Sequence, residues 1–367
     1  MILIGAALAS AVPCLARTKL VTLPGREAML VNIEHPERNL VMEERTITLE
    51  KGLTTIAFSW QGVQIDPSSI QLQPMEHPDT VTLISVSYPP NENALEWLVS
   101  CPEAGQERFR IYYLLGGVER QVEYRLDVAA DEQSAVLRAY YRLGNMSGED
   151  FDETVLYTGI GRGVEKSIES GARLQLLAAR FAPVSIAKVY RFKPFERPEV
   201  VGWYYEILNS AERGLGEYRL PAGKVRVYMQ STAGDDVFLG EDYLDALAVR
   251  EKDDLYLGDA RDVTAAHKQM DVERQNLRRA GSARQIVMWD EVIRIQYELQ
   301  NFKDEPITLL IEEVTSDNWD VEELTQGADW KRKHNGLLEI SVPLPPKSDK
   351  LVFDLTIRKT NQTQIKF

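Results

Sequence analysis

The sequence predicts an all-β fold, made of two or three antiparallel β-sandwich-like domains with little helix. Apolar and polar residues alternate strictly in several segments, and glycine, proline, asparagine or aspartate lies between these segments. Alternation places every second side chain on one face of a strand, and these residue types are typical of the turns that join strands. Because each strand has one half-solvated face, the sheets are expected to be antiparallel and to pack in pairs.

The alternation recurs along most of the chain. In QVEYRLDV, residues 121–128, the apolar side chains point to one face and the polar side chains to the other. The same pattern is found in residues 44–50, 223–228, 291–300, 338–342 and 351–359. The best helical candidates, residues 172–180 and 263–280, lack a full apolar stripe at helical spacing. Little helix is therefore expected.

The length of 367 residues suits more than one domain. The composition shifts at YPPNEN, residues 88–93, and again near GLGEYRLPAG, residues 214–223. These breaks predict the following division of the chain: an N-terminal β-domain at 17–90, a middle β-domain at 91–213 and a C-terminal β-sandwich domain at 214–367.

The amino terminus, MILIGAALASAVPCLA, is typical of a secretory signal peptide at residues 1–16. It carries no charged side chain from Ile2 to Ala16, and small residues at Cys14 and Ala16 fit a cleavage site. A buried first strand is the alternative, in a cytosolic protein that keeps these residues. The signal interpretation predicts a periplasmic or extracellular location. No later run approaches the roughly 18 apolar residues of a membrane span, so no span is expected.

The net charge of −14 makes nucleic acid a poor partner, because the summed field repels phosphate backbones and anionic lipid. No cofactor is expected. Calcium is the one alternative, through the acidic segments 234–236, 240–242 and 252–254 taken as loops, although none has the ligand spacing of a calcium loop. A solvated acidic surface explains the same residues.

The stretch TGIGRGVEKS, residues 158–167, is interpreted as a turn between strands and not as a phosphate-binding loop. A Walker-type loop has glycine directly before its Lys-Ser pair, whereas Glu165 stands there and would repel phosphate. Glycine instead supplies the positive φ angles of a turn between DETVLYT and the segment that follows.

Other catalytic signatures are missing from the sequence. The four histidines, His35, His77, His267 and His334, are dispersed, and no GxSxG motif is present. Cys101 stands alone once Cys14 is removed with the signal. Two neighbouring acids could serve glycoside hydrolysis, and the nominal pairs are Asp150 with Asp152 and Glu241 with Asp242. In a chain with 56 acidic residues, such pairs also arise by chance.

The sharpest local feature is the consecutive aromatic triplet Trp203, Tyr204 and Tyr205. Three successive residues of a strand cannot all face the core, so at least one ring is expected to be exposed or to lie at a domain interface. The triplet is therefore the candidate binding surface. No catalytic, cofactor or metal residue is assigned.

Several blocks of the sequence resemble the mucoidy inhibitor A family. They are QIDPSSIQL after GLTTIAFSW, the strand pair leading to NMSGEDF, then LPAGKVRVY, FLGED, LYLGDARDV and LQNFKDEPITLLIEEV. The resemblance runs from Arg26 to Lys359. It implies a β-rich protein of a family catalogued as a domain of unknown function, whose name records an effect on capsule production, and it supplies no catalytic residues.

The chain departs from the family pattern in two places. Ala246, Leu247 and Ala248 stand where relatives have a His-Thr-Pro triplet, and the segment from Asn93 to Gln106 is too short for the coiled coil that many relatives insert. A role for that histidine or for a coiled-coil partner surface is therefore not expected.

These observations favour a non-catalytic, secreted or periplasmic protein that binds or assembles with envelope components, either a protein or a glycan. Exposed sheet edges make a homo-oligomer the expected assembly. The alternative is a carboxylate-based or metal-assisted hydrolase that acts on envelope polysaccharide, with converging acids in a cleft.

Overall fold

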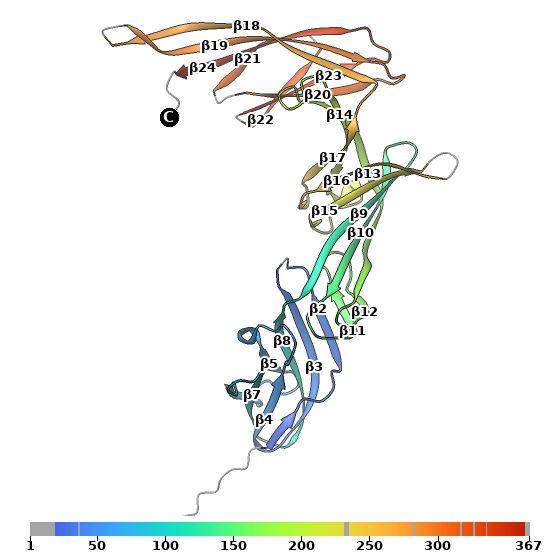
Figure 1. Ribbon diagram of the computed structural model, residues 1–367, viewed down its shortest axis with the longest axis vertical. Helices are drawn as coiled ribbons and strands as arrows, with labels where there is room; N and C mark the ends of the chain where they lie inside the picture. Colours follow the sequence, from blue (N-terminus) through green and yellow to red (C-terminus); the bar gives the residue numbers. More distant parts are fainter. Residues whose placement is uncertain are drawn as a thin grey trace, which may run out of the picture. The chain divides into compact units, whose positions relative to one another are not determined.

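The computed structural model describes residues 19–35, 37–230, 235–281, 284–315, 318–325, 327–334 and 336–363 (Figure 1). The signal peptide expected at residues 1–16 lies outside this part. Strands β1 to β24 make up most of the described chain, and its helical content is limited to two 3₁₀ turns, η1 (Pro67–Ser69) and η2 (Ala211–Arg213). The all-β prediction is confirmed. Both helical candidates are strands, because residues 172–180 fall largely in β13 and 263–280 form β18.

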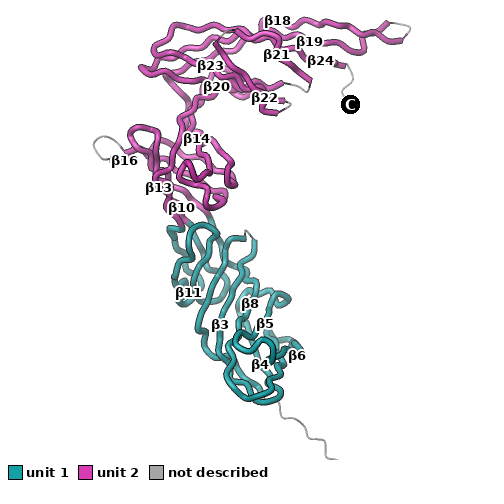
Figure 2. Tube along the Cα trace, turned by 180° about the vertical axis from the view of Figure 1, so that it is seen from behind, with its two compact units in different colours: residues 1–121, 141–178 teal, residues 122–140, 179–367 magenta. Residues whose placement is uncertain are grey.

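The chain forms two compact units (Figure 2). Unit 1 comprises residues 1–121 and 141–178, and unit 2 comprises residues 122–140 and 179–367. These limits fall within strands β9, β10 and β13 and do not coincide with the expected breaks at 90 and 213. The segment YPPNEN connects β6 to β7, which pair antiparallel in one sheet, so its turn residues serve a hairpin.

Unit 1 contains two sheets. The first has the order β1-β4-β7-β6, and its strands are β1 (Lys19–Thr22), β4 (Gly52–Ser59), β7 (Ala94–Cys101) and β6 (Thr82–Ser87). The second has the order β12-β11-β2-β3-β8-β5, and its strands are β12 (Val164–Ile168), β11 (Phe151–Tyr157), β2 (Ala28–Asn32), β3 (Asn39–Leu49), β8 (Gly105–Leu115) and β5 (Gln71–Pro74). Phe58 of β4 lies 5.9 Å from Tyr113 of β8 between ring centroids, so these two sheets face each other.

The other two sheets consist mainly of residues of unit 2. The larger has the path β16-β15-β9-β10-β13-β20-β23-β22, with β14 pairing to β13 and β17. Its strands are β16 (Asp236–Leu244), β15 (Gly223–Gln230), β9 (Val118–Val128), β10 (Ser134–Asn145), β13 (Arg173–Phe192), β20 (Ile307–Val314), β23 (Leu337–Leu344), β22 (Asp329–His334), β14 (Val201–Leu208) and β17 (Lys252–Asp259). The smaller has the order β18-β19-β24-β21, with strands β18 (Val263–Ala280), β19 (Gln285–Asn301), β24 (Leu351–Thr363) and β21 (Trp319–Leu324).

The core of unit 2 follows the predicted alternation. In β19 the side chains of Ile293, Ile295, Tyr297 and Leu299 are buried, as the period of two requires. They pack with apolar residues of β13, β20, β23 and β24 in one cluster, so this region is a sandwich of two sheets. Most strand pairs are antiparallel, while β1–β4, β2–β11, β9–β15 and β13–β20 are parallel.

Three fully buried asparagines close loops at the ends of long strands. Asn145 ends β10, Asn209 follows β14 and Asn301 ends β19. Each side-chain amide donates to a backbone carbonyl of the loop that follows it, and each side-chain oxygen accepts a backbone N–H. These bonds satisfy loop backbone groups that would otherwise be buried without partners. Asn145 and Asn301 lie in NMSGEDF and LQNFKDEPI, two blocks that carry the family resemblance.

The stretch TGIGRGVEKS joins two paired strands, as predicted. β11 pairs antiparallel with β12, and Glu165 of β12 lies opposite Val155. Gly159 and Gly161 between the strands have φ angles of 80° and 72°, which favour glycine. Lys166 and Ser167 therefore belong to a strand and do not open a helix.

The strand β6 is an exposed sheet edge in unit 1. Among the described strands it pairs only with β7, and all six of its residues are exposed. Leu83, Ile84 and Val86 keep 38%, 54% and 40% of their surface accessible. An edge with unpaired backbone groups and outward apolar side chains is suited to accept a further strand. The described part of the chain also contains no helix long and apolar enough to cross a membrane.

Candidate functional site

The aromatic triplet lies on β14 in unit 2, and its rings divide between the two faces of the strand. Trp203 and Tyr205 share one face, with ring centroids 5.5 Å apart and planes at 90°. Tyr204 packs on the other side against Tyr256 of β17, at 5.3 Å between centroids. Tyr205 is buried, while Trp203 and Tyr204 are half-buried. None of the three is fully exposed, and their role as a binding surface stays a prediction.

A polar network covers the face that Trp203 and Tyr205 share. The Tyr205 hydroxyl donates to Glu132 Oε1 over 2.6 Å, and Lys188 Nζ lies 2.8 Å from both oxygens of that carboxylate. Burial alone would raise the pKa of Glu132, but the hydrogen bonds from Lys188 and Tyr205 lower it. The Lys188 ammonium also lies 5.0 Å from the centre of the Trp203 ring. This cation–π contact occupies one face of the Trp203 ring.

Trp203 lines a cavity of about 250 Å³. Its polar lining consists of Lys188, Tyr190, Asp259, Arg261, Asp262 and Lys303. A second cavity of about 430 Å³ shares Lys188 and Tyr190 and adds Glu132 and Glu305. Small-ligand sites usually combine an apolar wall with a few polar groups, whereas charged and polar residues make up much of these linings. The two cavities therefore suit a small polar ligand better than an apolar one.

On the opposite face of β14, an ion pair fixes the loop before the strand. The Arg197 guanidinium binds both oxygens of Asp259, at 2.7 and 2.9 Å, and donates to the Tyr256 hydroxyl. The Arg197 and Tyr256 hydrogen bonds hold the pKa of Asp259 below its usual value. Asp259 is therefore ionised and already paired, which argues for a structural role.

A larger cavity of about 990 Å³ lies in unit 1 and collects acids. Glu149 lines it together with Asp150 and Asp152, the pair that the sequence suggested. Burial raises the pKa of Glu149, as expected for an acid that holds its proton in a cleft. Its carboxylate is nevertheless occupied, because Arg26 pairs with it and Tyr113 donates to it over 2.9 Å.

The sequence interpretation missed Glu43 and Glu149. Glu43 of β3 is fully buried and pairs with Arg26 and Arg45, at 2.7 and 2.9 Å. It occupies an inward position of an alternating strand, between Val41 and Ile47 on the same face. An acidic residue at an inward position of an otherwise apolar strand face indicates a buried ion pair, because burying an unpaired charge would cost folding free energy.

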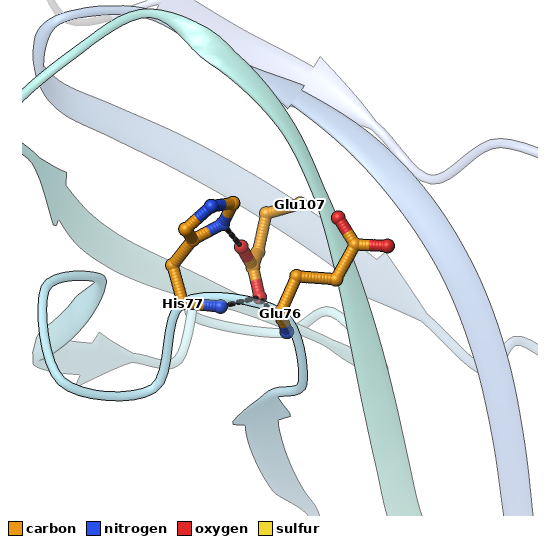
Figure 3. A group of neighbouring side chains, drawn as sticks. All are labelled: Glu76, His77 and Glu107. Atoms are coloured by element: carbon orange, nitrogen blue, oxygen red, sulfur yellow. Dashed lines mark hydrogen bonds and ion pairs between the residues drawn. The ribbon is translucent and has the colours of Figure 1, made fainter.

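Another buried carboxylate, Glu107 near the start of β8, organises a loop in unit 1 (Figure 3). Its Oε1 accepts the backbone N–H groups of Met75, Glu76 and His77, at 2.9, 2.8 and 3.2 Å. Its Oε2 lies 2.7 Å from His77 Nδ1. Glu76, His77 and Glu107 have ligand atoms close enough for a metal ion. All the oxygens of Glu107 are used inside the protein, however, so the group serves to hold the loop.

The acidic segments considered for calcium lie mostly in strands where the structure describes them, and Asp235 directly precedes β16. Residues 240–242 belong to β16, residues 252–254 begin β17, and Gly234 lies outside the described residues. Glu241 pairs with Lys224 and Arg226, and Asp254 pairs with Arg191. The first acidic segment lies where β15 connects to its antiparallel partner β16. Calcium binding stays a prediction.

Cys101, at the end of β7, is a free thiol that donates to the Glu103 carbonyl over 2.8 Å. It shares the lining of a cavity of about 390 Å³ with His77 and Glu107. Its sulfur does not belong to the metal-spaced group of these residues.

No protein-family model matches the chain, and no curated protein matches it. The resemblance to the mucoidy inhibitor A family therefore rests on the quoted residues.

Proposed function

We propose that the protein is a non-catalytic, secreted or periplasmic β-sandwich protein that binds or assembles with components of the cell envelope, and that it self-associates through a sheet edge. The observation that carries this proposal is the edge strand β6, with its outward apolar side chains Leu83, Ile84 and Val86. Native proteins usually protect such edges with charges, proline or a covering element. β6 carries no charged residue.

A second copy of the chain is a partner that fits this edge. Antiparallel pairing of β6 with β6 of another copy would be isologous, with the same surface used twice around a two-fold axis. Main-chain hydrogen bonds would supply affinity, and the apolar side chains would bury surface against one another. A strand of another envelope protein would use the same chemistry.

The envelope location is supported by the sequence. The uncharged start is typical of a secretory signal, and the family that the chain resembles takes its name from an effect on capsule production. The engaged carboxylates of Glu43, Glu107 and Glu149 support a non-catalytic role, because none has a free oxygen placed to attack a substrate without first breaking an ion pair or hydrogen bond.

Ile84→Lys is expected to shift the purified protein to a monomer. A charge on the edge opposes addition of a strand, while the side chain is exposed and its replacement leaves the core intact. The measurement is molar mass by light scattering over a concentration series. Wild type should exceed the monomer mass, and Val352→Lys should behave as wild type, because Val352 is similarly exposed but pairs with Glu298 of β19 in a different sheet.

A second candidate function is a carboxylate-based or metal-assisted hydrolase that acts on envelope polysaccharide. The observation that favours it is the raised pKa of Glu149 in a cavity shared with Asp150 and Asp152. We expect the wild-type protein to release no reducing ends from envelope glycans, with or without calcium. Release that disappears in Glu149→Gln, but not in Glu241→Gln, would instead establish the hydrolase.

A further inference from the structure

The distal part of the β18–β19 hairpin has a charge opposite to that of the chain. We define the hairpin tip as residues 274–281 and 284–289. This segment contains Arg274, Arg278, Arg279 and Arg284 and no acidic residue, although the chain has 56 acids and a net charge of −14. A basic segment in an otherwise acidic chain favours an anionic partner.

All four arginines are exposed. Arg279 and Arg284 form no ion pair with any described residue, Arg274 lies 4.3 Å from the centre of the Trp289 ring, and Arg278 Nη1 contacts the Met288 sulfur at 3.4 Å. The acids nearest in sequence, Glu273 and Asp290, lie at the base of the tip. Asp290 interacts electrostatically with Arg278, so the charges without an acidic partner among the described residues are those of Arg279 and Arg284.

The tip also projects from its sheet. Figures 1 and 2 show β18 and β19 running on past β21 and β24. Toward the hairpin turn, Met288 is the last residue of β19 that pairs with a described residue of β24. Between Met288 and the turn, β18 and β19 still pair with each other, Arg279 with Ile286 and Ala280 with Gln285. The eight residues from 274 to 281 span about 23 Å. This length exceeds the electrostatic screening length of about 8 Å at physiological salt. The acids at the base of the hairpin are therefore largely screened from its end, where the arginines determine the local field.

Outward apolar side chains accompany these charges. Leu277 and Val287 each keep 43% of their surface accessible. Arginine beside exposed aliphatic residues suits the lipid interface, where guanidinium groups contact headgroup phosphates and aliphatic groups enter the acyl boundary. A polyanion such as an acidic polysaccharide or a nucleic acid would use the arginines but leave Leu277 and Val287 in water.

We propose that the hairpin tip docks on an anionic lipid surface. The proposal rests on the envelope function proposed above and names the lipid surface as one of the components bound. It uses the β18–β19 tip of unit 2, whereas self-association uses β6 of unit 1. The two proposals can therefore fail independently.

The test is co-sedimentation of the full chain with phosphatidylcholine vesicles that contain or lack phosphatidylglycerol. Wild type should bind only the vesicles with phosphatidylglycerol. The double variant Arg279→Glu with Arg284→Glu should bind them about tenfold more weakly or worse, because each basic residue near an anionic surface contributes substantially to attraction. Leu277→Ser, which keeps every charge, should also weaken binding.

The matched control is Arg213→Glu with Arg219→Glu, which changes the net charge equally at two exposed positions outside the tip. It should bind as wild type. Thermal melting of each variant should match wild type, since the tip lies outside the core cluster. Light scattering on the same samples reports self-association separately.

Absence of binding to the phosphatidylglycerol vesicles would overturn the proposal, as would equal loss in the control. A polyanion partner would be indicated instead if an acidic polysaccharide or duplex DNA bound more tightly than these vesicles. That binding would be lost in the Arg279→Glu and Arg284→Glu variant but unaffected by Leu277→Ser, and this result would also overturn the proposal.

Discussion

Replacing Arg191 with methionine is expected to destabilise the protein by about 3–5 kcal/mol. Arg191 of β13 is only 3% exposed and binds three carboxylates, with distances of 2.5 Å to Asp254, 2.9 Å to Glu312 and 3.1 Å to Glu339. Methionine keeps much of the length of the side chain but removes the charge. The carboxylates would then stay in the sheet with fewer counter-charges, which costs more than the ion pairs themselves contribute.

Glu339 shows why these carboxylates stay charged. Burial alone would raise its pKa, but the hydrogen bonds from Lys331 and Lys333 outweigh burial and lower the pKa to about 2. Loss of Arg191 therefore does not lead to simple protonation of Glu339 at neutral pH. The cost appears as lost folding free energy.

The measurement is urea unfolding of wild type and Arg191→Met at neutral pH, followed by a probe of unit 2. Arg197→Met is the control, because Arg197 also binds a carboxylate with two hydrogen bonds but does so at the surface. A solvated pair contributes little, so the control should unfold near the wild-type midpoint. Equal effects of the two substitutions would contradict the view that burial sets the energy of the Arg191 cluster.

Asn301→Ala is expected to cost about 2–4 kcal/mol. The buried side chain donates to the Glu305 and Pro345 carbonyls, each at 2.9 Å, and accepts the Lys303 N–H at 3.0 Å. Alanine would leave these backbone groups without partners in a place where water has little access. The loop between β19 and β20 would lose the contacts that fix it.

Thermal unfolding of Asn301→Ala should show this loss, with Asn93→Ala as control. Asn93 is exposed, and its side chain forms no hydrogen bond with a described residue, so its replacement should change stability little. Hydrogen exchange should locate the effect in residues 301–307. A variant as stable as wild type, with the loop still protected, would show that the backbone groups find other partners.

The sequence predicted the strands best where alternation is long and apolar on one face. In β9 the side chains of Val122, Tyr124, Leu126 and Val128 are all buried as expected. The segment at 263–280 gave no clear pattern because most of β18 is exposed on both faces, so no apolar face is needed there. Exposure of this kind depends on which strands pair, and a local pattern does not contain that information.

The pairing of strands far apart in the chain could not be predicted from the sequence, for a related reason. The parallel pairing of Tyr190, Arg191 and Phe192 with Leu309, Leu310 and Ile311 joins β13 to β20 across more than a hundred residues. Turn chemistry fixes the register of a hairpin, but it has no influence on strands so far apart. The division into two units, with limits inside strands, has the same origin.

The candidate site was predicted in part. The sequence identified the aromatic triplet, and the structure places Trp203 beside a polar cavity. It gave no sign of the Glu132–Lys188 pair beside the ring, because the turn between β9 and β10 meets β13 and β14 only through strand pairing. Glu43 was detectable in principle, as an acid at an inward position of β3.

The most direct test of the central claim is crosslinking in the host from position 84. A photoreactive residue in place of Ile84 should crosslink the protein to a second copy or to another envelope protein, whereas the same residue in place of Val352 on β24 should not. This result would show that the edge of β6 is occupied in the cell. Absence of any crosslinked product from position 84, together with a monomer mass for the purified wild-type protein, would contradict assembly through β6.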